Sequence, residues 1–235
     1  PGELKMAVDI EEVKKQLSSM AEEQYQQFSR KLVPGTDNIL GVRIPQLRII
    51  AKKLAKEDWQ GFMAVADASS HEMLILQGLV LGFAKTDFPT LLPYIDSFID
   101  SITNWAICDT FVGGLKITTK YPQEMRSFVI SCLQSTATYR IRFGAVMLLN
   151  YYTDNNFLAE NLTLLEQITN DDYYVRMAVA WAVSIFFIKQ PEQTMPFLQN
   201  NHLDKFTHNK TLQKICESRV IDPETKKELK KLKRH

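Results

Sequence analysis

The segment YRIRFGAVMLL at residues 139–149 decides the fold, because similar segments stand at a fixed distance on either side of it. WAICDTFVGGL begins 34 residues earlier, at Trp105, and the segment that contains YVRMAVAWAV begins 34 residues later, at Tyr173. The same step reaches HEMLILQGLVLGF at His71 and THNKTLQKIC at Thr207. A constant period of this length is typical of helical repeat proteins.

Each repeat predicts one helical hairpin. Residues 139–152 form an apolar helical pattern, residues 153–156 a polar turn, and residues 157–169 an amphipathic helical pattern. First helices such as residues 73–83 and 175–188 are apolar on nearly every side, which predicts an inner layer covered by other helices. One hairpin cannot bury its own apolar face, so we expect an all-α protein whose HEAT-like hairpins stack into a curved solenoid with a concave face.

The N-terminal region interrupts the repeat. Residues 31–43 place the turn formers of residues 34–38 between short apolar runs, which predicts either a loop or a small β-hairpin. A helix is expected to resume near Pro45, since proline suits a first helical turn. We expect residues 1–5 to be a cloning remnant and residues 6–235 to form a single HEAT-like repeat domain.

Composition supports a folded chain and restricts its charge-driven partners. The 235 residues are 45% hydrophobic and include 13 Phe, 8 Tyr and 3 Trp, more than a disordered chain would carry. The net charge of +1 hides an asymmetry, because residues 201–235 hold 10 basic against 5 acidic groups and the remainder holds 18 against 22. A globally basic nucleic-acid binder is therefore excluded, and a polyanion would need a local patch.

Self-sufficient catalytic motifs are absent from the sequence, which has no HExxH, GxSxG or Walker loop. The stretch from Gly113 to Lys116 lacks the flanking strand and GK[ST] ending of a phosphate cradle, so it predicts helix packing. Three cysteines without CxxC spacing and four scattered histidines predict no metal site and no cofactor. With no signal peptide and no apolar run of roughly 20 residues, we expect a cytoplasmic, bacterial-type intracellular, nucleoid-associated protein without a membrane partner.

A set of polar and aromatic residues recurs at equivalent places in consecutive repeats. Trp105 and Asp109 are four residues apart and share one helix face. The next repeats place Arg142, Arg176 and Lys210 at the common 34-residue step, with Trp181 five residues beyond Arg176. These groups would converge if the first helices line the concave side. In the alternative interpretation Asp109 and Arg142 form an ion pair between helices, and the tryptophans fill the core.

The sequence resembles the AlkD-type DNA alkylation repair proteins, HEAT-like repeat proteins that include DNA glycosylases for cationic alkylpurines. The resemblance runs from about Glu22 onward. Its most specific parts are LGVRIPQLR at residues 40–48, NWAICD at 104–109, YRIRFGA at 139–145 and YVRMAVAW at 174–181.

The resemblance implies a role for several residues. Asp109 matches the essential carboxylate, Trp105 and Trp181 match aromatic groups that contact the lesion nucleotide, and Phe28 falls near a third aromatic position that is a tyrosine in the glycosylases. Arg142 matches an arginine that holds the DNA backbone near the lesion. The further residues expected at the DNA are Arg43, Arg48, Arg140, Arg176 and Lys210. The implied partner is double-stranded DNA, alkylated or branched, and the protein is expected to be a monomer.

Two departures from the family pattern leave the function open between three classes. Arg43-Ile44 replaces a Gln-Thr pair of the family, and the loop ahead of it is longer. The first hypothesis is a DNA glycosylase that hydrolyses the N-glycosidic bond of N3- or N7-alkylated purines. The second is a non-catalytic binder of branched or distorted DNA that uses the loop at residues 34–38, and the third is a protein–protein scaffold.

Overall fold

Several helices of this protein begin at a side chain that caps the first turn. Ser70 accepts a hydrogen bond from the backbone N–H of Met73 at 3.0 Å, and Asp87 accepts one from Thr90 at 2.8 Å. Asp204 and Asp222 cap two later helices in the same way. Such caps satisfy backbone donors that have no partner within the helix, so they fix where these helices start.

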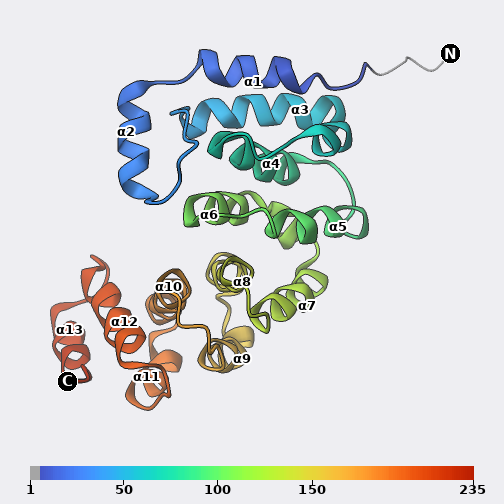
Figure 1. Cartoon of the computed structure of the whole chain (residues 1–235). Helices are drawn as coiled ribbons and strands as arrows, with labels where there is room; N and C mark the ends of the chain where they lie inside the picture. Colours follow the sequence, from blue (N-terminus) through green and yellow to red (C-terminus); the bar gives the residue numbers. More distant parts are fainter. Residues whose placement is uncertain (1–5) are drawn as a thin grey trace. The chain divides into compact units, whose positions relative to one another are not determined.

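A computed structural model describes residues 6–235 and shows helices without strands in that range (Figure 1). The expectation for residues 1–5 lies outside the described residues. The helices of the first half are α1 (Ile10–Ser19), α2 (Glu23–Leu32), α3 (Ile44–Val65), α4 (His71–Phe83), α5 (Phe88–Ile99), α6 (Trp105–Gly114) and the 3-10 helix η1 (Lys116–Thr119). Those of the second half are α7 (Pro122–Leu133), α8 (Thr138–Tyr151), α9 (Asn155–Glu166), α10 (Tyr173–Lys189), α11 (Pro191–Gln199), α12 (Lys205–Glu217) and α13 (Pro223–Lys230).

The predicted repeat is confirmed. The first helices of successive hairpins, α4, α6, α8, α10 and α12, begin at residues 71, 105, 138, 173 and 205. Each of them is followed by a second helix, so the all-α class and the hairpin unit are both as the sequence predicts.

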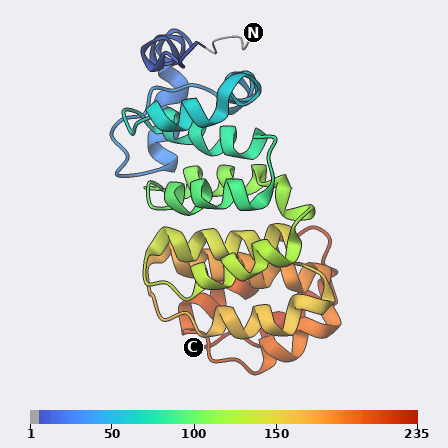
Figure 2. The ribbon, with the colours of Figure 1, turned by 90° about the vertical axis from the view of Figure 1, so that its right-hand side faces the viewer.

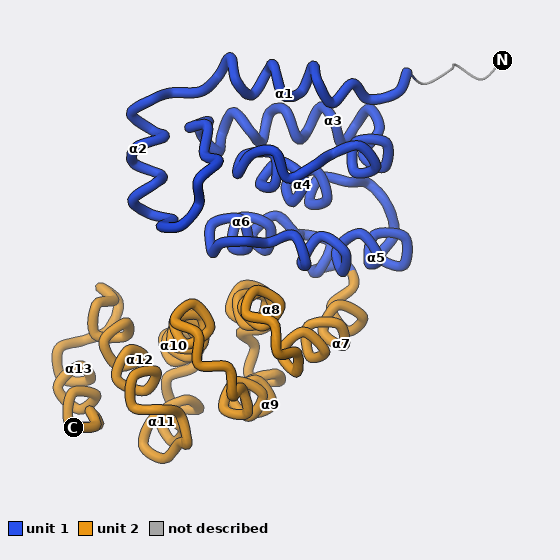
Figure 3. The backbone as a smooth tube through the Cα atoms, in the orientation of Figure 1, with its two compact units in different colours: residues 1–120 blue, residues 121–235 orange. Residues whose placement is uncertain are grey.

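The chain divides into two compact units, one ending at Lys120 and one beginning at Tyr121 (Figure 3). In the first unit α4 packs against α3, α5 and α6. In the second unit α10 packs against α8, α11 and α12, and α13 packs against α12. Figures 1 and 2 both show α8 and α10 side by side. Within each unit the first helices therefore stack directly on one another.

The first helices are buried on most sides, as their apolar sequences predict. Every residue from His71 to Leu81 of α4 is buried, and so is every residue from Ile141 to Leu149 of α8. Burying apolar surface stabilises the fold by about 25 cal/mol for each Å² removed from water, so these two helices carry much of the hydrophobic stabilisation of their units.

Residues 33–43 form a loop, which we call the connecting loop, and not the β-hairpin that was the other expectation. Helix α3 begins directly after it at Ile44, with Pro45 in the first turn as predicted. Gly41 has a φ of +97°, and a Cβ atom there would lie 2.5 Å from the Glu22 carbonyl oxygen. Only glycine fits this position, where the connecting loop meets the start of α2.

Helices α4 and α6 approach closely at Gly82. A Cβ atom on Gly82 would lie 2.7 Å from the carbonyl oxygen of Gly114, the last residue of α6. The stretch from Gly113 onward thus serves helix packing, as the sequence predicts.

We expect Gly82→Ala to lower the free energy of unfolding by about 1–3 kcal/mol, because the added methyl group must push two backbones apart. Chemical denaturation followed by circular dichroism measures this loss. Gly114→Ala is the matched control, since no described residue lies within 4 Å of a Cβ atom there. Equal stability of the two variants would show that the Gly82 contact is not tight.

Candidate functional site

Trp105 and Asp109 lie together in a pocket of the first unit. The Asn104 side chain accepts a hydrogen bond from the Ile107 N–H at 3.0 Å, which starts α6 at Trp105 and sets both residues on one face. The pocket has a volume of 220 Å³, and its lining includes Trp105, Asp109, Tyr25 and Glu72. We call it the carboxylate pocket. Both Trp105 and Asp109 are half-buried, so the Asp109 carboxylate is not sealed in the core.

The indole of Trp105 is held by α2. Its Nε1–H donates a hydrogen bond of 2.9 Å to the carbonyl oxygen of Leu32, the last residue of that helix. This bond uses the only polar group of the indole. Any further recognition by Trp105 must therefore come from the electron-rich face of the ring, which attracts cations.

The aromatic residue of α2 in the carboxylate pocket is Tyr25. Phe28, the residue expected from the resemblance, is 55% exposed and is not part of the pocket lining. Its ring centre lies 6.1 Å from that of Tyr25, one helical turn away. The guanidinium of Arg43 lies 4.9 Å from the centre of the Tyr25 ring, and its Nε is 2.9 Å from a carboxylate oxygen of Glu22. The aromatic residue of α2 that lines the pocket with Trp105 and Asp109 is thus a tyrosine, and not a phenylalanine.

Glu72 is a site residue that the sequence analysis missed. Its side chain is buried, and one carboxylate oxygen accepts the N–H of Leu40 at 2.9 Å. The other oxygen accepts the N–H groups of Gly41 at 2.8 Å and Val42 at 3.1 Å. Burying a carboxylate is costly unless hydrogen bonds compensate it, and three converging donors do so here. The available signal was a lone acidic residue at the start of the apolar helix HEMLILQGLVLGF.

A second polar contact fixes the other end of the connecting loop. The Asn104 Nδ2 donates to Thr36 Oγ1 and to His71 Nδ1, both at 3.1 Å. Since the amide is the donor, His71 Nδ1 must be the acceptor, which requires a neutral ring. The backbone N–H of His71 also donates to the Asn38 carbonyl at 3.0 Å. The loop is therefore held on α4 and α6, while Pro34 and neighbouring residues remain exposed.

Arg43 and Arg48 are exposed at the start of α3. They follow the connecting loop directly, so the loop contacts that fix Val42 also fix the backbone from which Arg43 extends. Both residues are placed where a partner of the first unit can reach them.

The second unit holds the remaining predicted residues. Arg142 is only 6% exposed, and its guanidinium donates to the Tyr174 carbonyl at 2.8 Å. Arg140 Nη1 lies 4.0 Å from the sulfur of Cys132. Trp181 is half-buried on α10. Whether Trp105 and Asp109 meet Arg142 and Trp181 remains a prediction, because the two pairs belong to different units.

Positive charge gathers in the second unit. The Arg176 guanidinium lies 4.4 Å from the centre of the Phe206 ring and 3.8 Å from an Asp204 oxygen. Burial lowers the pKa of Lys214, Glu217 opposes this shift, and repulsion from Lys210 and Arg142 adds to it. Cations from α8 and α12 therefore lie close enough to repel one another, an arrangement that a bound polyanion would relieve.

The part of the chain that contains the carboxylate pocket and the cations of the second unit also matches a known family. The family model of the DNA alkylation repair enzyme covers residues 13–217. The chain belongs to this family. No curated protein matches the sequence of this repair protein closely enough to be compared with it. Its family membership confirms the resemblance and implies DNA as the substrate.

Two further properties of the repair protein concern residues 6–235. No group of three or more His, Cys, Asp or Glu side chains in this range is arranged to hold a metal ion. No helix within the same range has the length and apolar character needed to cross a membrane.

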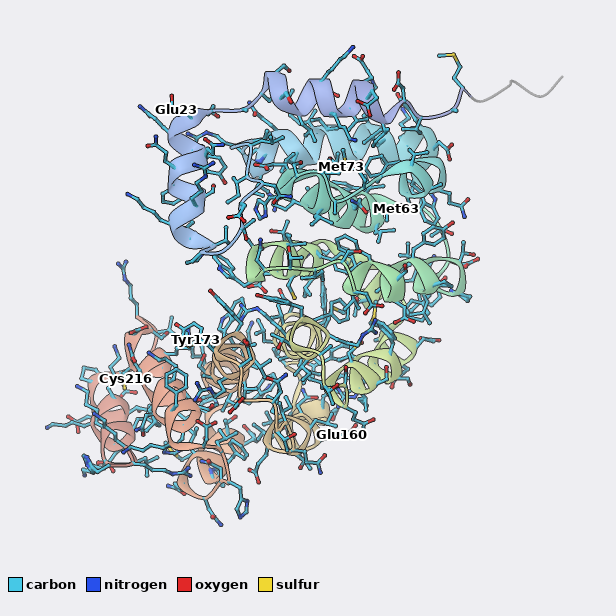
Figure 4. The ribbon with its side chains drawn as sticks, in the orientation of Figure 1. Glu23, Met63, Met73, Glu160, Tyr173 and Cys216 are labelled. Carbon is cyan, nitrogen blue, oxygen red and sulfur yellow. The ribbon has the colours of Figure 1, made fainter. Side chains whose placement is uncertain are left out.

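We expect Glu72→Gln to lower the free energy of unfolding of the repair protein by about 1–3 kcal/mol. The Gln amide group turns an N–H donor toward backbone donors, so at least one buried hydrogen bond is lost. Urea denaturation measures the change. Glu23→Gln on the exposed start of α2, labelled in Figure 4, removes the same charge and serves as the control. A control that loses as much stability would contradict a specific role for Glu72.

The protonation of His71 gives a pH prediction. Burial lowers the pKa of His71 below its usual 6.5, against the opposing effect of Glu72. A histidine whose pKa is lowered on folding favours the folded state at pH values above its pKa in the unfolded chain. This contribution is lost as the pH falls through 6.5 toward the pKa of the folded state. Between about pH 7 and pH 5.5, we expect the free energy of unfolding to fall more steeply in the wild type than in His71→Gln. Parallel slopes in urea denaturation across this window would contradict the assignment.

Proposed function

We propose that this chain is a DNA glycosylase that hydrolyses the N-glycosidic bond of purines carrying a positive charge from N3 or N7 alkylation. The observation that carries the proposal is the carboxylate pocket, where Asp109 lies beside Trp105 and Tyr25 and remains accessible. Family membership supplies the substrate class, and the pocket supplies groups suited to the reaction.

The chemistry requires little from the protein besides a placed negative charge. Alkylation at N3 or N7 makes the purine cationic and weakens its bond to the sugar, so the sugar develops oxocarbenium character as the base leaves. The Asp109 carboxylate stabilises this positive charge or orients the attacking water, the role of a carboxylate in glycoside hydrolysis.

The aromatic groups of the pocket would bind the charged nucleotide. A cation over an indole or phenol ring gains about 0.5–2 kcal/mol, and more of this is realised when water is excluded. Trp105 is suited to this role because its N–H is already engaged by Leu32, which keeps the ring in one orientation. Tyr25 takes the third aromatic position in this pocket. The resemblance assigns the second aromatic position to Trp181 of the second unit.

The second unit would hold the DNA backbone. Arg140, Arg176 and Lys210 would contact phosphates, which positions a duplex without reading its sequence, and Arg142 would add its charge from a buried position. Arg43 and Arg48 would make similar contacts from the first unit. Lys210 and Arg142 both repel Lys214, and phosphate contacts would offset this effect.

A base-release assay on methylated DNA tests the proposal. The wild type should release 7-methylguanine or 3-methyladenine, and Asp109→Asn should release either base at least about 100-fold more slowly, the loss typical of removing one catalytic group. Asp171→Asn is the control, an exposed acidic residue outside the carboxylate pocket. Thermal unfolding of both variants shows that each remains folded.

Release of the base by Asp109→Asn at the wild-type rate would exclude the proposed mechanism. If the wild type releases no base but binds DNA, the second candidate applies: a non-catalytic binder of branched DNA. The connecting loop favours that candidate, because Asn104 holds it at Thr36 and Glu72 holds it at residues 40–42, while residues 34, 35, 37 and 38 are exposed. A fixed, exposed loop suits the recognition of DNA shape.

A further inference from the structure

A groove in the second unit is separate from the carboxylate pocket. It has a volume of 1010 Å³ and runs along α12, with α13 and the residues after it on one side. We call it the α12 groove. Ligand sites of drug-sized molecules have volumes of roughly 300–1,000 Å³, so the groove has room for at least one nucleotide.

The rim of the α12 groove is positively charged. Its cations come from three parts of the chain: Arg176 on α10, Lys205 and Lys210 on α12, and Lys230 and Lys233 at the C-terminal end. Only two acidic residues line the same groove, Asp204 and Glu217. This imbalance favours a ligand that carries several negative charges.

The floor of the groove is apolar and contains an aromatic ring. Phe206 lies there with Leu212 and Cys216. The Lys210 ammonium lies 5.8 Å from the centre of the Phe206 ring, and the Tyr173 ring centre lies 6.1 Å from it. Figure 4 labels Tyr173 at the first turn of α10 and Cys216 on α12. An aromatic ring bordered by cations matches a ligand with a flat apolar face and adjacent negative charge.

The C-terminal lysines are held in place by hydrogen bonds. The Arg234 guanidinium donates to the carbonyl of Asn201 at 2.9 Å, and its backbone N–H donates to Asn209 Oδ1 at 2.9 Å. His208 Nε2 lies 2.8 Å from the Leu232 carbonyl oxygen. Lys233 therefore belongs to a fixed segment, and less conformational entropy is lost when it binds a ligand.

We propose that the α12 groove binds a stretch of unpaired DNA, with phosphates on the lysines of its rim and a base stacked on Phe206. The proposal rests on DNA being the substrate of the protein. Unpaired bases expose the flat faces that a duplex hides, and single-strand sites combine a basic groove with aromatic side chains. The groove thus complements the carboxylate pocket by holding nucleotides that are not in a duplex.

Fluorescence anisotropy with a labelled oligothymidine strand tests the aromatic contact. Phe206→Ala should weaken binding about tenfold, because stacking of one base contributes about 1–3 kcal/mol. Binding of a blunt duplex should change much less. Phe206→Leu keeps most of the apolar volume but lacks the aromatic face, so it should also weaken binding. This variant tests the contact if the alanine variant does not fold.

A pair of double variants tests the rim. Lys230→Ala with Lys233→Ala removes two groove cations and should lower the salt slope of binding by about 1.4, since each single-strand phosphate contact contributes about 0.7. Lys227→Ala with Lys231→Ala removes the same charge from exposed positions outside the groove and should change the slope little. Circular dichroism confirms that both remain folded.

Three results would overturn the proposal. The first is an equal loss of salt slope in the two double variants, and the second is full oligothymidine binding by both Phe206 variants. The third is displacement of the oligothymidine by polyglutamate at equal charge, which would indicate a site for an acidic peptide. The base-release assay is independent of these measurements, since oligothymidine contains no alkylated purine. Base release with no oligothymidine binding would reject the groove alone. Oligothymidine binding with no base release would reject the glycosylase alone.

Discussion

The first unit depends on one buried negative charge. Glu72 is 1% exposed, and three backbone N–H groups of the connecting loop converge on its carboxylate. A buried charge without such partners would cost several kcal/mol, so the loop cannot leave without exposing the carboxylate to water or burying it unpaired. The contact determines the path of residues 40–42, and with it the start of α3 and the position of Arg43. The carboxylate pocket is shaped by the same loop, since Val33 and Val42 belong to its lining.

The repeat could be predicted from the sequence because the signals that determine each hairpin lie within that hairpin. An apolar helix and a turn recur every 32 to 35 residues, and both signals are local. The connecting loop could not be predicted in the same way. It is fixed by Glu72, His71 and Asn104, which lie 30 or more residues further along the chain, and hydrogen bonds over that distance leave no periodic pattern.

The candidate site shows the same division between local and distant signals. Trp105 and Asp109 could be placed on one helix face from their spacing alone, and the structure confirms it. The aromatic partner on α2 could not be assigned, because Tyr25 and Phe28 are one turn apart and the loop length shifts any alignment across it. The basic C-terminal tail was visible in the composition, but only contacts such as Arg234 with Asn201 separate a fixed groove wall from a solvated helix end.

The hydrogen bond between Trp105 and Leu32 makes the indole an optical sensor of its own surroundings. Indole emission depends on the polarity around the ring and on whether its N–H is bonded, and here both depend on α2 remaining against α6. Separation of α2 from α6 would expose the ring to water and release the N–H together, so the emission colour of this side chain would report whether the two helices remain in contact. The protein thus carries an intrinsic spectroscopic label at the place where its chemistry is expected.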